Sequence, residues 1–243
     1  MELLDIDFKY TETKYKMYFD LNYPTQSLLY NHFNSNVICD PPMVETILEC
    51  VKPNTTVIDI GCHIGYYTLI IRQKIGDNGF IYAFDPNPYT FSVFVDNIVV
   101  NNYSNIYAFN LALSNCDTIS TLSIPEYDEG LSTMCEIENI NSGKITDKYR
   151  IKKTVTTITK RMDSIFQNKR NLDVSLIKID VEGFEEYVIN GGSEFIKNNR
   201  PENLIFEINK YVPNQKENQL LSILDFLIPL GYTPYILCPW PTE

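Results

Sequence analysis

The arrangement of apolar and polar positions along this chain predicts a regular succession of strands and helices. Short, nearly continuous apolar runs are typical of strands that are covered on both faces of a sheet. Such runs lie at residues 57–60, 80–84, 106–109, 176–179 and 204–208. The first three are separated by segments of helical periodicity, and this order of elements predicts a parallel sheet with right-handed crossovers.

Apolar residues at helical spacing mark the helices that accompany these strands. They occupy residues 44–51, 67–75, 91–99 and 220–228, with a shorter helix at 187–191. Asp40 followed by two prolines is typical of a helix start, where the acid is expected to cap the helix. Beyond Gly231, residues 232–238 are predicted to form a sixth strand.

The pattern changes between residues 112 and 160. Residues 118–124 and 154–159 alternate like antiparallel strands, and the stretch between them is polar. We therefore predict an α/β fold: a mostly parallel, doubly wound sheet with an antiparallel segment inserted between core strands 3 and 4. Residues 1–39 are mixed and aromatic, and we expect short strands or loops that form a flap on the core of residues 40–243. The length of 243 residues favours a single domain overall.

The charge and the cysteines narrow the class of partner and the compartment. The net charge of −11 disfavours a nucleic-acid partner, because proteins that bind nucleic acids normally present a basic surface. None of the six cysteines has CxxC spacing, and scattered thiols of this kind fit a reducing compartment. The N-terminus lacks the features of a signal peptide, and no apolar run approaches the length of a membrane span. We therefore expect a cytoplasmic protein without a transmembrane segment.

Residues 56–67, TVIDIGCHIGYY, carry the first chemical signal. A buried strand that runs through a glycine turn into a helix is how open α/β sheets build a nucleotide site. The dinucleotide fingerprint has a second glycine that admits a pyrophosphate, whereas this chain has His63 at that place. The spacing Asp59-x-Gly61-x-x-x-Gly65 suits instead a ligand such as S-adenosylmethionine (SAM), whose adenosine and amino-acid ends lie across the turn.

Two later positions extend this site. Asp85 ends the second predicted strand, where an acid faces the crevice and can accept both ribose hydroxyls of a nucleoside. The alternative is that Asp85 only forms a turn with Pro86, but its distance from the glycine turn favours the ligand. Asn110, Leu111 and Ala112 follow the third strand, where a side-chain amide can reach an adenine edge.

Four segments together resemble the FkbM family of SAM-dependent methyltransferases: VIDIGCHIGYYT, GFIYAFDPNP, NLALSN and LIKIDVEGFE. The resemblance covers residues 40 to about 235, and KIDVEG together with DPNP is its specific part. It implies a Rossmann-like class I methyltransferase fold and methyl transfer to hydroxyl oxygens, often on sugars or polyketide-like products. It also implies a set of cofactor-binding residues, which are Asp59, Gly61, Cys62, His63, Gly65, Tyr66, Asp85, Pro86, Asn110, Leu111 and Ala112.

The chain departs from the family pattern in three places. The family usually has Ala-Asn where this chain has Cys62 and His63, so His63 brings an ionisable group close to the ligand. The family usually has Glu where this chain has Asp85, whose side chain is one methylene shorter. The fold usually adds an antiparallel seventh strand after the sixth, and little sequence remains here to form one.

The segment Lys178-x-Asp180-x-Glu182-Gly183 carries the candidate catalytic residues. A lysine within an apolar strand is costly to bury unless it is paired, and the acid that ends the strand is its obvious partner. One interpretation is a lysine–carboxylate pair that holds a turn. The other is catalytic, with Asp180 or Glu182 as the general base for an acceptor hydroxyl and Lys178 beside it. His63 is a second candidate for the base, but the favoured interpretation is a polar residue that faces the ligand.

Glu207 and Asn209 end the fifth predicted strand. Together with Asp180 they offer the oxygen ligands of a divalent-metal site of the Mg²⁺ type. The alternative is that these side chains form hydrogen bonds to the substrate or to a loop. A divalent metal is therefore a second cofactor hypothesis beside SAM.

Three functions are consistent with these residues. The first is a SAM-dependent O-methyltransferase whose acceptor is a hydroxyl of a small molecule or glycan. The second is ribose 2′-O-methylation of RNA, since Lys178, Asp180 and Glu207 form a Lys–Asp–Glu set, although the acidic charge counts against it. The third is a non-catalytic SAM-fold scaffold, which the intact glycine turn and Asp85 disfavour.

Overall fold

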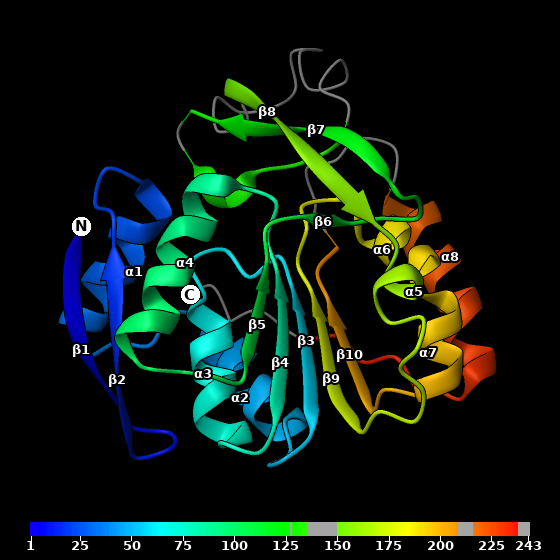
Figure 1. Cartoon of the computed structure of the whole chain (residues 1–243), viewed down its shortest axis with the longest axis horizontal. Coiled ribbons are helices and arrows are strands. Elements are labelled where there is room, and N and C mark those ends of the chain that lie inside the picture. The colour runs from blue at the N-terminus through cyan, green and yellow to red at the C-terminus, as the bar shows by residue number, and fades with distance from the viewer. Residues whose placement is uncertain (127, 136–149, 209–215, 238–243) are drawn as a thin grey trace.

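The centre of the molecule is a parallel sheet, whose strands lie side by side in Figure 1. The computed structural model describes residues 1–126, 128–135, 150–208 and 216–237. Within these ranges the sheet has five strands in the order β10-β9-β3-β4-β5, and every neighbouring pair is parallel. The strands are β3 (Thr56–Ile60), β4 (Phe80–Phe84), β5 (Ile106–Phe109), β9 (Val174–Ile179) and β10 (Asn203–Phe206). The predicted parallel core is confirmed.

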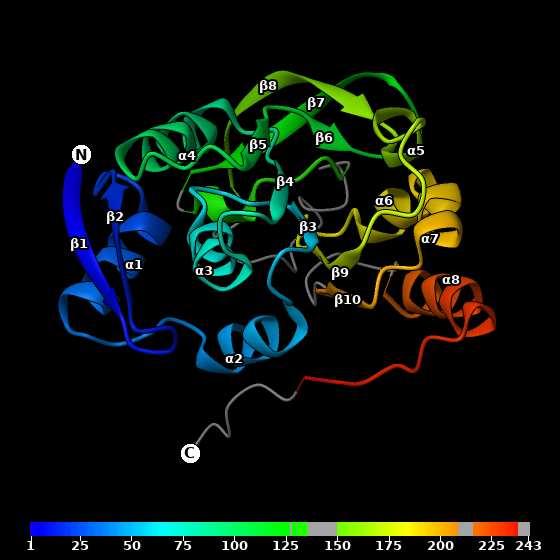
Figure 2. The same ribbon diagram turned by 60° about the horizontal axis from the view of Figure 1, so that its bottom comes forward.

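Helices cover both faces of this sheet (Figure 2), as continuous apolar strands require. Val57 of β3 points into one cluster of buried apolar side chains, which includes residues of α2 (Pro41–Cys50), α3 (Tyr66–Ile75) and α4 (Pro88–Val100). Ile58 and Ile60 point into the cluster on the opposite face, because successive side chains of a strand alternate. The helices of that second face are α5 (Met162–Ile165), α6 (Glu185–Gly191), α7 (Ser193–Asn199) and α8 (Lys216–Leu227), which is followed by η4 (Ile228–Leu230).

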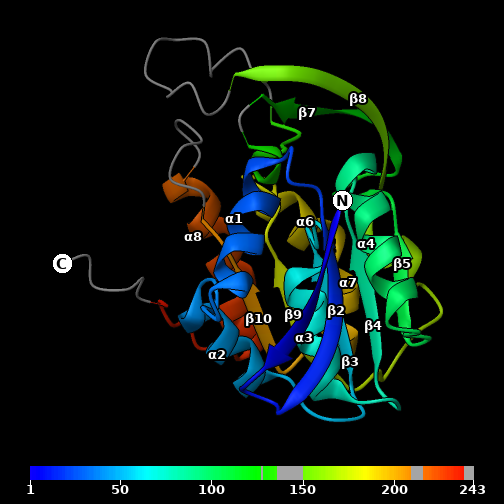
Figure 3. The ribbon, with the colours of Figure 1, turned by 90° about the vertical axis from the view of Figure 1, so that its left-hand side faces the viewer.

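The N-terminal segment forms an antiparallel hairpin, β1 (Glu2–Phe8) and β2 (Thr13–Phe19), followed by the helix α1 (Pro24–Asn34). Its apolar side chains share the core cluster of α3 and α4, on the side of the molecule that faces the viewer in Figure 3. The main chain of β2 is also hydrogen-bonded to α4. The side-chain amide of Asn101 bonds to the backbone of Lys16, and that of Asn97 bonds to the backbone of Tyr18. The expectation of strands or loops was wrong for α1, whose aromatic residues hid its helical pattern.

The segment between core strands 3 and 4 forms a second sheet, which lies above the carboxyl ends of the core strands in Figure 1. It consists of β6 (Ala112–Leu113), β7 (Thr118–Pro125) and β8 (Ile151–Lys160), with the short 3₁₀ helix η1 (Glu129–Leu131) after β7. β7 and β8 pair antiparallel, and β6 pairs parallel with β8. The predicted antiparallel insertion is therefore confirmed.

Two local predictions are wrong. Residues 232–237 form no strand, and Tyr235 and Ile236 are 89% and 90% exposed, so this apolar run packs on no sheet edge. Residue 238, at the end of that predicted strand, lies outside the described residues. Asp40 begins α2 but does not cap it, because its backbone is left-handed and its carboxylate accepts the hydroxyl of Tyr67 instead. In the described part of the chain, no helix has both the length and the apolar character to cross a membrane.

Candidate active site

Two glycines of the turn between β3 and α3 lie in close contact with other elements, one with a backbone carbonyl and the other with an aromatic side chain. Gly61 has a positive φ of 80°, and a Cβ there would lie 1.8 Å from the carbonyl oxygen of Asp180. Gly65 also has a positive φ, and a Cβ there would lie 2.4 Å from the ring of Phe94 in α4. Both positions therefore require glycine, and the turn is fixed against the residue that follows β9 and against the middle of α4.

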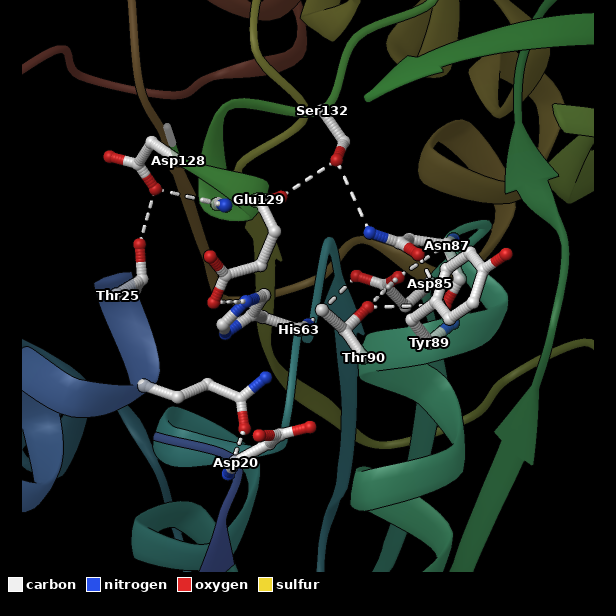
Figure 4. Close-up of polar contacts among 12 residues, drawn as sticks. Asp20, Thr25, His63, Asp85, Asn87, Tyr89, Thr90, Asp128, Glu129 and Ser132 are labelled. Carbon is white, nitrogen blue, oxygen red and sulfur yellow. Dashed lines mark hydrogen bonds and ion pairs between the residues drawn. The ribbon is translucent and has the colours of Figure 1, made fainter. Parts of the chain in front are cut away.

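Asp85 follows β4 at the carboxyl edge of the sheet and is almost fully buried. Its carboxylate accepts the backbone N–H groups of His63 and Asn87, each at 2.9 Å, and the hydroxyl of Thr90 at 3.0 Å (Figure 4). Burial raises the pKa of Asp85, and these donors oppose that shift. A carboxylate offers about four acceptor positions, so about one remains for a ligand.

A cavity of about 370 Å³ opens between the glycine turn, the end of β4 and the insertion. The predicted cofactor residues that line it are Gly61, Cys62, His63, Tyr66, Asp85, Pro86, Leu111 and Ala112. Asp180 and Glu182 line it from β9 and the residues that follow, and Glu207 lines it from the end of β10. The structure thus brings most of the sequence-predicted residues to one cavity.

Three predicted cofactor positions, Asp59, Asn110 and Gly65, are not among the residues that line the cavity. The carboxylate of Asp59 is fully buried, where it accepts the hydroxyl of Thr68 at 2.5 Å. The amide of Asn110 donates to the carbonyl of Asp85 at 2.8 Å and so supports the strand end. Gly65 serves the packing of Phe94 described above. These roles depend on partners in other elements, which sequence spacing does not reveal.

Lys178 is buried within β9, among groups that stabilise its charge. Its Nζ lies 3.2 Å from Asp180 Oδ2 and 3.6 Å from Asp59 Oδ1, and 4.9 Å from the ring centre of Tyr67. Burial alone opposes the ammonium, but the two carboxylates outweigh it and raise the pKa of Lys178. The lysine is therefore a permanent cation behind the cavity wall, where it faces Asp180.

Asp180 and Glu207 form a pair of carboxyl groups at the edge of the cavity. Glu207 is an exposed residue, yet the loss of water around its carboxyl group and the hydrogen-bonded Asp180 beside it raise the pKa of Glu207 to about 7. A hydrogen bond between two carboxyl groups requires one proton between them, so the pair binds a proton near neutral pH.

Glu182 completes this group of acids. Its backbone is left-handed, and its carbonyl accepts the hydroxyl of Thr133 at 2.8 Å, which ties the turn after β9 to the insertion. One carboxylate oxygen each from Asp180, Glu182 and Glu207 lies within 4.8 Å of the others. This donor set suits a hard cation such as Mg²⁺, although the ammonium of Lys178 competes for the same charge. Asn209, the other predicted ligand, lies outside the described residues.

The residue that sequence reasoning missed is Glu129 of η1. It lines the cavity from the insertion, and its Oε1 lies 3.5 Å from His63 Nε2 (Figure 4). Its neighbours Asp128 and Gly130 look like an ordinary polar turn, so no spacing signal was available. Cys62, beside His63, is buried, and burial together with nearby carboxylates raises the pKa of its thiol.

Core strands in the spatial order 3-2-1-4-5, a glycine turn after the first and an acid after the second define a Rossmann-like domain of the class I methyltransferase type. The family model "Methyltransferase FkbM domain" matches residues 59–234, and the chain belongs to this family.

The chain is also similar to individual proteins. It is 32% identical over 143 residues to methyltransferase 1 of Beauveria bassiana (strain ARSEF 2860), and this match spans 56% of the chain and 57% of that protein. A precorrin-6y C5,15-methyltransferase from Geobacter metallireducens is 13% identical, with a TM-score of 0.44 over 81% of this chain and 74% of that one. A SAM-dependent O-methyltransferase from Thermotoga maritima is 12% identical, with a TM-score of 0.43 over 79% of this chain and 51% of that one.

Proposed function

We propose that this protein transfers a methyl group from SAM to a hydroxyl group of a small molecule or glycan. The observation that carries the proposal is the pair of Asp180 and Glu207 at the edge of the cavity, with Lys178 behind Asp180. An alcohol loses its proton far above neutral pH, so its attack on a methyl group needs a positioned base. A carboxyl pair that exchanges a proton near pH 7 is suited to that task.

The residues around the cavity fit SAM. A volume of about 370 Å³ lies in the range of small-molecule sites. Asp85 retains an acceptor position for a hydroxyl, and His63 stands where a pyrophosphate would need glycine. When bound, SAM would supply an electrophilic methyl group on a sulfonium.

Each residue of the cluster has a separate task in this proposal. The acceptor hydroxyl would donate a hydrogen bond to the Asp180–Glu207 pair. The pair would take its proton as the oxygen bonds to the methyl carbon and the bond between that carbon and the sulfonium sulfur breaks, which would release S-adenosylhomocysteine. Lys178 holds Asp180 in place through their 3.2 Å contact. Base catalysis of this kind contributes on the order of 10²–10⁴-fold, and alignment of the two reactants supplies much of the remainder.

The test is methyl transfer from labelled SAM to a panel of sugars, nucleotide sugars and lipids, with RNA as a further arm. Asp180→Asn should leave the affinity for S-adenosylhomocysteine unchanged and lower kcat by about 10²–10⁴-fold. Asp173→Asn, just before the opposite end of β9, is the matched control and should retain wild-type turnover.

The outcomes separate the competing functions. Failure to bind S-adenosylhomocysteine in calorimetry would refute the proposal and favour a scaffold. Methylation of RNA in preference to every small acceptor would instead support the ribose 2′-O-methyltransferase. We expect EDTA to leave turnover unchanged, because Lys178 already supplies a positive charge beside Asp180.

A further inference from the structure

Glu129 is buried without the partners that a carboxylate normally requires. It is 3% exposed, and neither carboxylate oxygen has a hydrogen-bond partner among the described residues. The ring of His63 can form a cation, but its Nε2 lies 3.5 Å from Glu129 Oε1, beyond a good hydrogen bond. This Nε2 also has no hydrogen-bond partner within the described ranges. Buried carboxylates are costly unless they are paired, so this position is best explained by a ligand.

The position of Glu129 is fixed by its neighbours. The carboxylate of Asp128 accepts the hydroxyl of Thr25 in α1, and the hydroxyl of Ser132 donates to the Glu129 carbonyl at 2.7 Å. The amide of Asn87, which follows β4, donates to Ser132 Oγ at 3.3 Å. Contacts from α1 and from the end of β4 therefore hold η1 in place, so the carboxylate is preorganised toward the cavity rather than mobile.

Asp85 and Glu129 flank the same part of the cavity. His63 lies between them: its backbone N–H donates to Asp85 Oδ2 at 2.9 Å, and its ring faces Glu129 (Figure 4). Asp85 accepts three hydrogen bonds from its own chain, so about one acceptor position is left on it. The two hydroxyls of a vicinal diol need two acceptors, and Asp85 provides room for one.

We infer that Glu129 is a ligand-binding residue: its carboxylate accepts one ribose hydroxyl of the bound nucleoside, while Asp85 accepts the other. The inference rests on the proposed function, because it takes SAM as the ligand. A sugar acceptor also carries vicinal hydroxyls, and the KM for such an acceptor distinguishes it from the ribose of the nucleoside. Asp85 and Glu129 thus form one binding site for a diol, in which each carboxylate accepts one of the two hydroxyls.

The test is calorimetry of S-adenosylhomocysteine with the wild type and Glu129→Gln. Glutamine keeps the size of the side chain but loses its charge, and we expect binding to weaken by about tenfold to 100-fold. Glu126→Gln, an exposed position in the same insertion, is the control and should retain wild-type affinity. The 2′-deoxy and 3′-deoxy analogues form the second arm: with the analogue that lacks the hydroxyl held by Glu129, Glu129→Gln should cause no further loss.

Each result has a distinct meaning. No binding of S-adenosylhomocysteine by the wild type would refute the proposed function itself. Wild-type binding with an unchanged affinity in Glu129→Gln would overturn only the present inference. An unchanged affinity together with a raised KM for a sugar acceptor would assign the diol to the acceptor, and the ribose assignment would fall.

The melting temperature without ligand provides the check on folding. Because the Glu129 carboxylate is buried without a hydrogen-bond partner among the described residues, we expect the unliganded Glu129→Gln variant to melt at the wild-type temperature or above it. A lower melting temperature would assign Glu129 to the support of the fold and would also overturn the inference.

Discussion

The raised pKa of Glu207 makes the Asp180–Glu207 pair open to a direct pH test. If the pair is the general base, only its deprotonated form turns over. With a pKa of about 7, a tenth of the molecules are in that form at pH 6 and about a hundredth at pH 5. The kcat/KM for a hydroxyl acceptor should therefore fall tenfold per pH unit below 7 and reach a plateau above 8.

Glu207→Gln removes the group that titrates near neutral pH. The limb of the pH profile centred near pH 7 should disappear, while affinity for S-adenosylhomocysteine stays unchanged. Glu202→Gln, at the opposite end of β10 and paired with Lys52, is the matched control and should keep the wild-type profile. A Glu207→Gln profile that still bends near pH 7 would show that another group sets the pH dependence, and the reasoning about the pair would be wrong.

The same group should also affect folding, with a sign that follows from linkage. The pKa of Glu207 is raised from 4.5 to about 7 in the folded protein, so the folded state binds more protons than the unfolded chain between these values. The free energy of unfolding should then decline as the pH rises from 4.5 to 7 and change no further above that. Urea denaturation at pH 5 and pH 8 measures this, and the decline should be smaller in Glu207→Gln than in the wild type.

Two further substitutions test Asp85 and the glycine turn: the first is measured as ligand affinity and the second as stability of the fold. Asp85→Ala should abolish measurable binding of S-adenosylhomocysteine in calorimetry, because it removes both the ribose acceptor and the anchor of the His63 backbone; unchanged affinity would contradict the ribose assignment. Gly61→Ala should destabilise the fold by about 2–4 kcal/mol in urea denaturation, because its Cβ would meet the Asp180 carbonyl at 1.8 Å. Gly76→Ala is its control: the φ of 79° is equally positive, no described atom lies within 4 Å, and so the loss should be clearly smaller.

The parallel core and the glycine turn were predictable because their signals are local. The strands around Val57 and Ile177 are continuous apolar runs, and Gly61 marks the turn by its place after a strand. The proximity of Lys178 and Asp180 follows from their positions two residues apart on one strand. Family resemblance added the methyltransferase interpretation to these local patterns.

The failures concern partners that come from distant segments. Asp59 was expected to line the cavity, but Lys178 and Thr68 draw its carboxylate into the core. Glu129 gave no signal, because its place beside His63 depends on how the insertion folds back over the sheet. The run at 232–238 has the composition of a strand, yet residues 232–237 pair with no strand of the described sheets.

The contact between α4 and β2 has a consequence for association between molecules. The side-chain amides of Asn97 and Asn101 both accept from and donate to the main chain of β2, at Tyr18 and Lys16, as a neighbouring strand would. Four residues of a helix, the spacing of Asn97 and Asn101, advance about 6 Å, and two residues of a strand advance about 6.6 Å, so the two spacings match. An open strand edge is a template for aggregation. Here the helix α4, in place of a third strand, occupies the hydrogen-bonding groups of β2 at Lys16 and Tyr18.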